Sequence, residues 1–155
     1  IVEDLIVDSN FGEGIRLYAS KSIIRNNLVT NTGGSTYIAN SPAYGIYADG
    51  DDFSIHGNTV SGVTGVGSGY GVGISTDTSS DRSIVHNNTI SNISSTAGIW
   101  FQGGTQHIAN GNRITKPGSY GIAFGGTGSY MDNLVVGATS TSYNGTGTAA
   151  GTTNY

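Results

Sequence analysis

The chain has 155 residues, enough for one domain, and only 10% of them are charged. Its formal net charge is −4 with 6 Lys and Arg in total, which argues against a nucleic-acid partner because neutralising phosphates requires clustered cations. The absence of cysteine excludes a disulfide framework and a thiolate metal site, and no apolar run is long enough to cross a membrane.

The chain opens on a partial repeat. We align residues 1–8 with residues 24–31, so that Asp4 takes the place of Asn27 and Ile6 faces the interior. Because the sequence starts within a repeat, we interpret it as a piece of a longer protein.

Five repeats follow, each starting with Gly-Ile and continuing, after a polar stretch, to Asn-x-Val, Asn-x-Ile or a close variant. The spacing from glycine to asparagine is nearly constant, whereas successive glycines are 31, 28, 25 and 23 residues apart. The segment after each asparagine therefore accommodates insertions. The glycines are Gly14, Gly45, Gly73, Gly98 and Gly121, and the asparagines are Asn27, Asn58, Asn88, Asn112 and Asn133.

Each repeat predicts three short strands. Alternation in the first puts Ile15 and Leu17 on one face and Arg16 and Tyr18 on the other, which is the strand period. We expect Ile24, Ile55 and Val85 to point inward on the second strand, and Ile6, Val29, Val60, Ile90, Ile114 and Val135 to do so on the third. Strands this short must stack on their copies, so we predict an all-β parallel β-helix, a solenoid of about five to six coils.

The repeated asparagine is predicted to form a ladder. At an inward bend its amide can donate to the equivalent carbonyl oxygen one coil away, which satisfies buried polar groups. Asparagine also tolerates the left-handed backbone that a sharp bend needs.

From about Ala138 the repeat gives way to Thr, Ser, Gly, Asn and Tyr. We therefore divide the chain into coils at 1–137 and a polar tail or cap at 138–155. A tail can cover the last coil, join a second copy of the chain as a homo-oligomer contact, or act as a flexible linker. Tyr143 and Tyr155 favour docking.

Stacked coils turn sequence columns into surface stripes with a spacing of about 4.8 Å. The outward columns of the first strand combine aromatic rings, which cover the apolar faces of sugars, with planar polar groups that bind hydroxyls. We therefore predict a polysaccharide groove on this face, flanked by the variable segments with Tyr37, Tyr44, Tyr70 and Tyr120, and Arg16 as a candidate partner for an acidic sugar. The candidate binding residues are Arg16, Tyr18, Tyr47, Trp100 and Gln102.

Asp49 and Asp77 are the candidate catalytic residues. On adjacent coils their carboxylates would approach to about 5 Å, near the separation in retaining glycosidases, and like-charge proximity would raise one pKa. Alternatively, both residues only start turns, as in Asp49-Gly50.

A second outward stripe carries two histidines, His56 and His86, which could bind an anion, carry protons or simply face solvent. The stripe comprises Val2, Arg25, His56, His86, Asn110 and Met131.

The Gly-Ile-x-apolar and Asn-x-Val/Ile pattern over residues 1–136 resembles the right-handed parallel β-helix superfamily of pectate lyases, polygalacturonases, alginate epimerases and phage tailspike depolymerases. The resemblance implies right-handed coils and an extracellular or surface-exposed protein that binds or degrades a polysaccharide as a lyase, hydrolase or depolymerase. It also implies that Asp49 and Asp77 could hold Ca²⁺, the one cofactor considered. No catalytic signature of these families is complete here. The alternative is a structural or adhesive solenoid of a cell surface, virion or filament.

Overall fold

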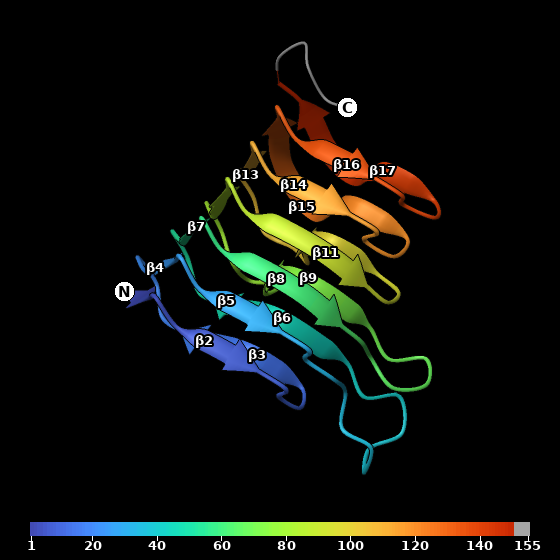
Figure 1. Ribbon diagram of the computed structural model, residues 1–155. Helices are drawn as coiled ribbons and strands as arrows, with labels where there is room; N and C mark the ends of the chain where they lie inside the picture. The colour runs from blue at the N-terminus through green and yellow to red at the C-terminus, as the bar shows by residue number, and fades with distance from the viewer. Residues whose placement is uncertain (151–155) are drawn as a thin grey trace.

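The computed structural model describes residues 1–150 as a stack of coils built from short strands, rising from the N-terminus to the C-terminus (Figure 1). None of the described residues forms a helix that could span a membrane. Tyr155, which we expected to favour docking of the tail, lies outside the described residues.

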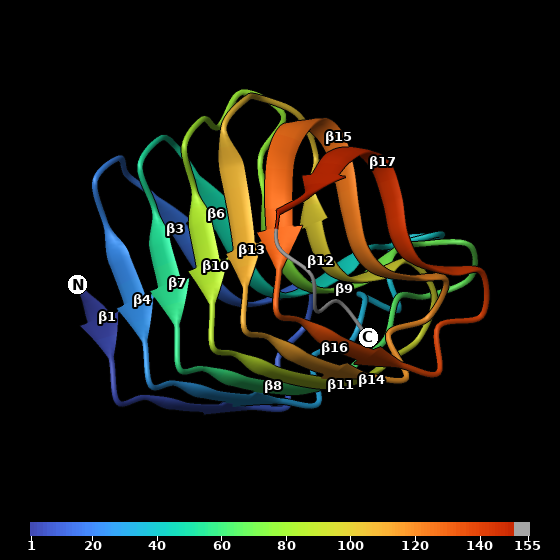
Figure 2. The same ribbon diagram turned by 90° about the horizontal axis from the view of Figure 1, so that it is seen from above.

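Each coil contributes one strand to each of three parallel arrays, which enclose the interior (Figure 2). The first array consists of β3 (Glu13–Tyr18), β6 (Ala43–Asp49), β9 (Gly71–Thr76), β12 (Ala97–Phe101) and the start of β15 (Tyr120–Met131). The second consists of β1 (Val2–Glu3), β4 (Ile23–Arg25), β7 (Ser54–His56), β10 (Ile84–His86), β13 (His107–Asn110) and the end of β15. The third consists of β2 (Ile6–Asp8), β5 (Leu28–Thr30), β8 (Thr59–Val63), β11 (Thr89–Ile93), β14 (Arg113–Thr115) and β16 (Leu134–Val136).

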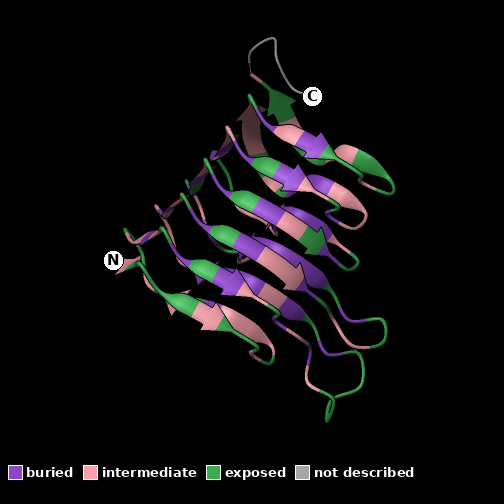
Figure 3. Cartoon of the chain, viewed as in Figure 1, coloured by how far each residue is buried: buried purple, intermediate pink, exposed green. Residues whose placement is uncertain are grey.

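The core lies between the arrays and consists mainly of the predicted inward columns, with Phe53, Val63 and Ile93 in addition. Figure 3 shows, on the strands of the third array other than β2, a buried residue flanked by exposed or intermediate ones. Because neighbouring coils pair in register, like residues stack on like, as Val60 does on Ile90. The prediction of an all-β parallel solenoid is confirmed.

The first position of each repeat is glycine because the interior leaves no room for a side chain there. A Cβ atom added to Gly73 would lie 2.6 Å from Cγ2 of Ile90 and 2.5 Å from the carbonyl oxygen of Gly98. The other four glycines of this column each face a Val or Ile of the third array in the same way. Close packing between the first and third arrays therefore depends on this column.

The asparagine ladder is confirmed. The side-chain amide of each ladder asparagine donates to Oδ1 of the next, over 3.0 Å for Asn58 to Asn88 and 2.9 Å for Asn112 to Asn133. The same Oδ1 atom also accepts the backbone N–H of the preceding coil's asparagine, as Asn88 does from Asn58. The left-handed backbone falls on the residue before the ladder position instead, for example Asn26 and Asn87, with φ of 55° and 54°.

The alignment of the first eight residues is wrong by one position. Val2 pairs with Ile24, and Leu5 rather than Asp4 takes the ladder position, where its N–H donates to Oδ1 of Asn27. Val7 therefore pairs with Val29, and Ile6 points outward and is 79% exposed. A slip of one residue reverses every side chain of a strand, and the first coil has no ladder asparagine to fix its register.

In the last coil the first and second arrays merge into the single curved strand β15. The segment that we assigned to the tail or cap forms β17 (Thr141–Ala149), which pairs in parallel with β15. Its Tyr143 ring stacks on Tyr130, with the centroids 4.0 Å apart. β17 therefore covers the last coil and adds one more strand to the sheet.

The variable segments lie between the third array of one coil and the first array of the next. The longest, residues 31–42, extends furthest from the coils (Figure 1). These segments adjoin the N-terminal ends of the first-array strands.

Candidate functional site

The register of the first array brings the predicted binding residues onto one outward face. Arg16 pairs with Tyr47, and Ser75 pairs with both Tyr47 and Trp100. Tyr18 pairs with Asp49. Asp77 and Gln102 directly follow β9 and β12, whose last residues, Thr76 and Phe101, lie opposite each other, so both continue the Tyr18 and Asp49 column.

A third outward column lies at the residue before each glycine, and only two of its members, Tyr44 and Tyr120, were predicted to line the groove. Both the glycine and the isoleucine of each Gly-Ile pair pack inward. The residue before the glycine therefore faces outward, although strict strand alternation would point it inward. Glu13 forms an ion pair with Arg16, and Tyr44 contacts Tyr47. The glycine column was the available signal, since a glycine between two larger residues permits such a bend. The members are Glu13, Tyr44, Val72, Ala97 and Tyr120. The three columns together are called the aromatic face below.

At the N-terminal end of the aromatic face, Arg16 lies between two rings. Its Cζ atom is 4.4 Å from the ring centroid of Tyr18 and 4.7 Å from that of Tyr47. Nη1 of Arg16 lies 2.5 Å from Oε1 of Glu13. The guanidinium is therefore both stacked and paired with a carboxylate.

The face also carries two edge-to-face aromatic pairs. The ring centroids of Tyr44 and Tyr47 are 4.9 Å apart, and those of Tyr70 and Trp100 are 5.4 Å apart. Tyr70 is contributed by the variable segment before β9, as predicted for the groove wall. By contrast, Tyr37 is 98% exposed at the tip of the loop 31–42.

The larger side chains cover the small ones on this face. Ser75 is completely buried although it points outward, and Tyr47 is only 7% exposed. Nε2 of Gln102 donates to Oγ of Ser75 over 3.0 Å. The rings most open to solvent are those of Tyr18 and Tyr70, which are 64% and 50% exposed, and Trp100 is half-buried.

Asp77 is held as a carboxylate by four donors. The hydroxyl of Tyr47 donates to Oδ2, and Oδ1 accepts from the hydroxyls of Thr78 and Ser79 and from the N–H of Ser79. These bonds, with that of Tyr47 first, lower the pKa of Asp77. Burial, with the Asp77 carboxylate as the next cause, raises the pKa of Tyr47. Asp77 therefore starts a turn. We expected one carboxyl group of the Asp49 and Asp77 pair to have a raised pKa, and the pKa of Asp77 is lowered instead.

Asp49 occupies the same column one coil earlier and is half-buried. No hydrogen bond to its side chain occurs within residues 1–150. No group of three or more His, Cys, Asp or Glu side chains in that range is arranged to hold a metal ion. Asp49 and Asp77, which we considered for Ca²⁺, supply two carboxylates, and the remaining ligands of the roughly six to eight oxygens that Ca²⁺ takes would have to come from other groups.

The stripe of the second array begins with Glu3 rather than Val2, because of the slip in the first coil. Arg25 forms an ion pair with Glu3 over 2.5 Å. The rings of His56 and His86 stack with their centroids 4.7 Å apart. Burial, and then the neighbouring His56, lowers the pKa of His86.

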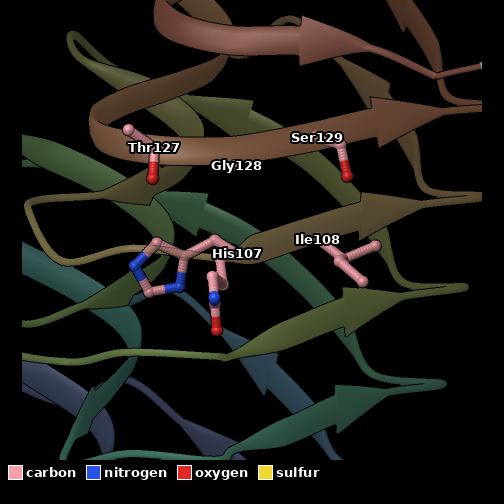
Figure 4. A pocket seen from close by; sticks show the side chains of 6 residues that line it. His107, Ile108, Thr127, Gly128 and Ser129 are labelled. Carbon is pink, nitrogen blue, oxygen red and sulfur yellow. The ribbon is translucent and has the colours of Figure 1, made fainter.

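A depression of about 400 Å³ lies between β13 and β15 beside His107 (Figure 4). His107 is completely buried, stacks on Phe101, accepts from the N–H of Ser83 and bonds the carbonyl oxygen of Gly103. Burial lowers its pKa. Both ring nitrogens are satisfied, so His107 is a structural residue and the depression holds no free titratable group.

The stacked parallel strands, inward apolar columns and asparagine ladder define the class of protein as a parallel β-helix. The chain belongs to the right-handed β-helix family, because the family model described as "Right handed beta helix region" matches residues 1–140. Its coils are therefore right-handed. A search of curated proteins and a search of solved structures found no match to the chain. Membership of this family is consistent with a polysaccharide-related or a structural role.

Proposed function

We propose that the chain is a carbohydrate-binding β-helix of a cell exterior or surface, with a polysaccharide lying along the aromatic face. The observation that carries the proposal is the row of rings and planar polar groups that crosses four successive coils, from Tyr18 and Arg16 to Tyr70 and Trp100. Exposed rings of this kind cover the apolar faces of sugar rings.

The polar groups of the face support the same function. The carboxylates of Asp49 and Asp77 can each accept hydrogen bonds from sugar hydroxyls, and the exposed part of Gln102 can add a further contact. Neighbouring rungs repeat at about 4.8 Å. A chain molecule that crosses the coils would therefore meet an aromatic or polar side chain at each of these rungs.

The geometry favours binding over bond cleavage. A retaining glycosidase needs one carboxyl group that is protonated at the working pH. The four donors around Asp77 lower its pKa and keep it ionised. We therefore assign Asp77 as a hydrogen-bond acceptor for the ligand instead of a catalytic acid.

The test is affinity electrophoresis through gels that contain different polysaccharides, followed by size-exclusion chromatography of each polymer. Retardation of the wild-type protein that Trp100→Ala abolishes would support the proposal. The matched control is His56→Ala, which removes a ring from the second array. This variant should migrate as the wild type does. Equal retardation of wild type and Trp100→Ala would contradict the proposal, and shortened polymer would return Asp49 and Asp77 to a catalytic role.

A further inference from the structure

We infer that the aromatic face takes an uncharged polysaccharide and disfavours uronic acid polymers, an inference that rests on the proposed binding function. The positions of the charges on the chain carry this inference, which differs from the expectation that Arg16 would pair with an acidic sugar.

Arg16 is the one cation of the aromatic face. The other five Lys and Arg residues of the chain lie elsewhere: Lys21 and Arg82 in the turns between the first and second arrays, Arg25 on β4, and Arg113 and Lys116 on and directly after β14. Arg82 already pairs with Asp51 and Asp52 in those turns. No second positive group is available on the face to bind a repeating anionic chain.

Arg16 is already engaged by an anion. It is paired with Glu13 over 2.5 Å and held between the rings of Tyr18 and Tyr47. A ligand carboxylate would have to share the guanidinium with the Glu13 carboxylate, which has the same charge, or displace it and leave Glu13 without its partner.

The remaining charges of the face are negative. Glu13, Asp49 and Asp77 provide three carboxylates against the single guanidinium of Arg16. Asp77 in particular stays ionised, because its pKa is lowered. A polymer with a carboxylate on every sugar would meet like charges at successive rungs, which opposes binding.

A neutral polysaccharide avoids this repulsion and uses the same groups favourably. Its hydroxyls can donate to Asp49 and Asp77, and its C–H faces can cover Tyr18, Tyr70 and Trp100. The acceptor carboxylates and exposed rings thus select for hydroxyl-rich, uncharged sugars.

The experiment compares each of several neutral polysaccharides with the same polymer after oxidation of its primary alcohols to carboxylates. The backbone is unchanged, so the pair differs in charge. Affinity electrophoresis at low salt should show retention by a neutral polymer at least about tenfold stronger than by its oxidised form, and added salt should narrow the difference. The double variant Glu13→Gln with Asp49→Asn should gain affinity for the oxidised form.

The outcomes distinguish the preference for neutral sugars from the proposed binding function. Equal or stronger retention by the oxidised polymers, still abolished by Trp100→Ala, would overturn the preference for neutral sugars and leave the binding function standing. Retention by no polymer of either kind would overturn both. A double variant that melts like the wild type but gains no affinity for the oxidised form would also contradict the charge argument.

Discussion

The hydroxyl of Tyr47 donates a hydrogen bond to the carboxylate of Asp77, across two neighbouring coils. The bond ties the outward face of β6 to the turn after β9. Tyr47 is only 7% exposed, so its ring supports the aromatic face from below and Asp77 presents its charge at the edge. This one hydrogen bond therefore holds the buried ring of Tyr47 in place and keeps the carboxylate of Asp77 charged.

Tyr47→Phe should raise the pKa of Asp77 towards its ordinary value, because the largest cause of the lowering is removed. Loss of a partly exposed hydrogen bond should lower the free energy of unfolding by about 1 kcal/mol. The carboxyl pKa can be followed by NMR titration. Tyr18→Phe, which removes the hydroxyl of a 64% exposed ring, is the control. An unchanged pKa of Asp77 would show that the Tyr47 hydroxyl does not hold it.

Asn88→Ala should destabilise the protein by about 3 kcal/mol or more, because several buried groups lose a partner at once. The side chain of Asn88 bonds Asn58, Asn112 and the carbonyl oxygen of Ile55. Chemical denaturation measures the effect. The exposed Thr89→Ala next to it should change stability little, and equal effects of the two variants would argue against the ladder.

Gly73→Ala should destabilise by about 1–3 kcal/mol through overpacking, since the added methyl group meets Ile90 and the backbone of Gly98. Gly33→Ala is the matched control, because a Cβ atom at Gly33 meets nothing within 4 Å. In thermal unfolding, Gly73→Ala should have a clearly lower melting temperature than Gly33→Ala. If they melted together, the glycine column would not be set by packing.

His107 should make the protein less stable as the pH falls below about 6.5. Burial lowers the pKa of His107 in the folded chain, so the unfolded chain binds the proton first. The contribution is complete above the unfolded pKa and is lost as the pH falls through the folded one. His86, with its lowered pKa, adds to the same slope.

Urea denaturation between about pH 7 and pH 5 tests this slope, because the carboxylates titrate mainly below that range. His107→Gln should be less stable at neutral pH and show a shallower decline. A decline as steep as that of the wild type would assign the pH dependence to other groups.

The repeat alone was sufficient to predict the coils, the inward columns and the ladder, because each of these depends on side-chain size and polarity at a fixed position. The first coil shows the limit. Leu5 replaces the asparagine that marks the register elsewhere, and the alignment shifted by one residue. His107 is buried beside a turn whose path the repeat does not determine.

The predicted face residues do lie on one surface, but their exposure could not be predicted. Strand alternation gives the side of the sheet to which Tyr47 and Ser75 point. It does not say that Ser75 is completely buried there, with Gln102 bonded to its hydroxyl. The burial of Ser75 depends on the side-chain rotamers of residues on neighbouring coils, which the repeat does not specify.

The asparagine ladder also has a direction. In every link the amide donates toward the C-terminal end and the carbonyl oxygen faces the N-terminal end, from Asn27 to Asn133. Aligned dipoles add, as they do for peptide groups in a helix, and each bond in such a chain polarises the next. The interior of this solenoid is therefore electrically polar along its axis, and its two ends present opposite partial charges to whatever stacks on them.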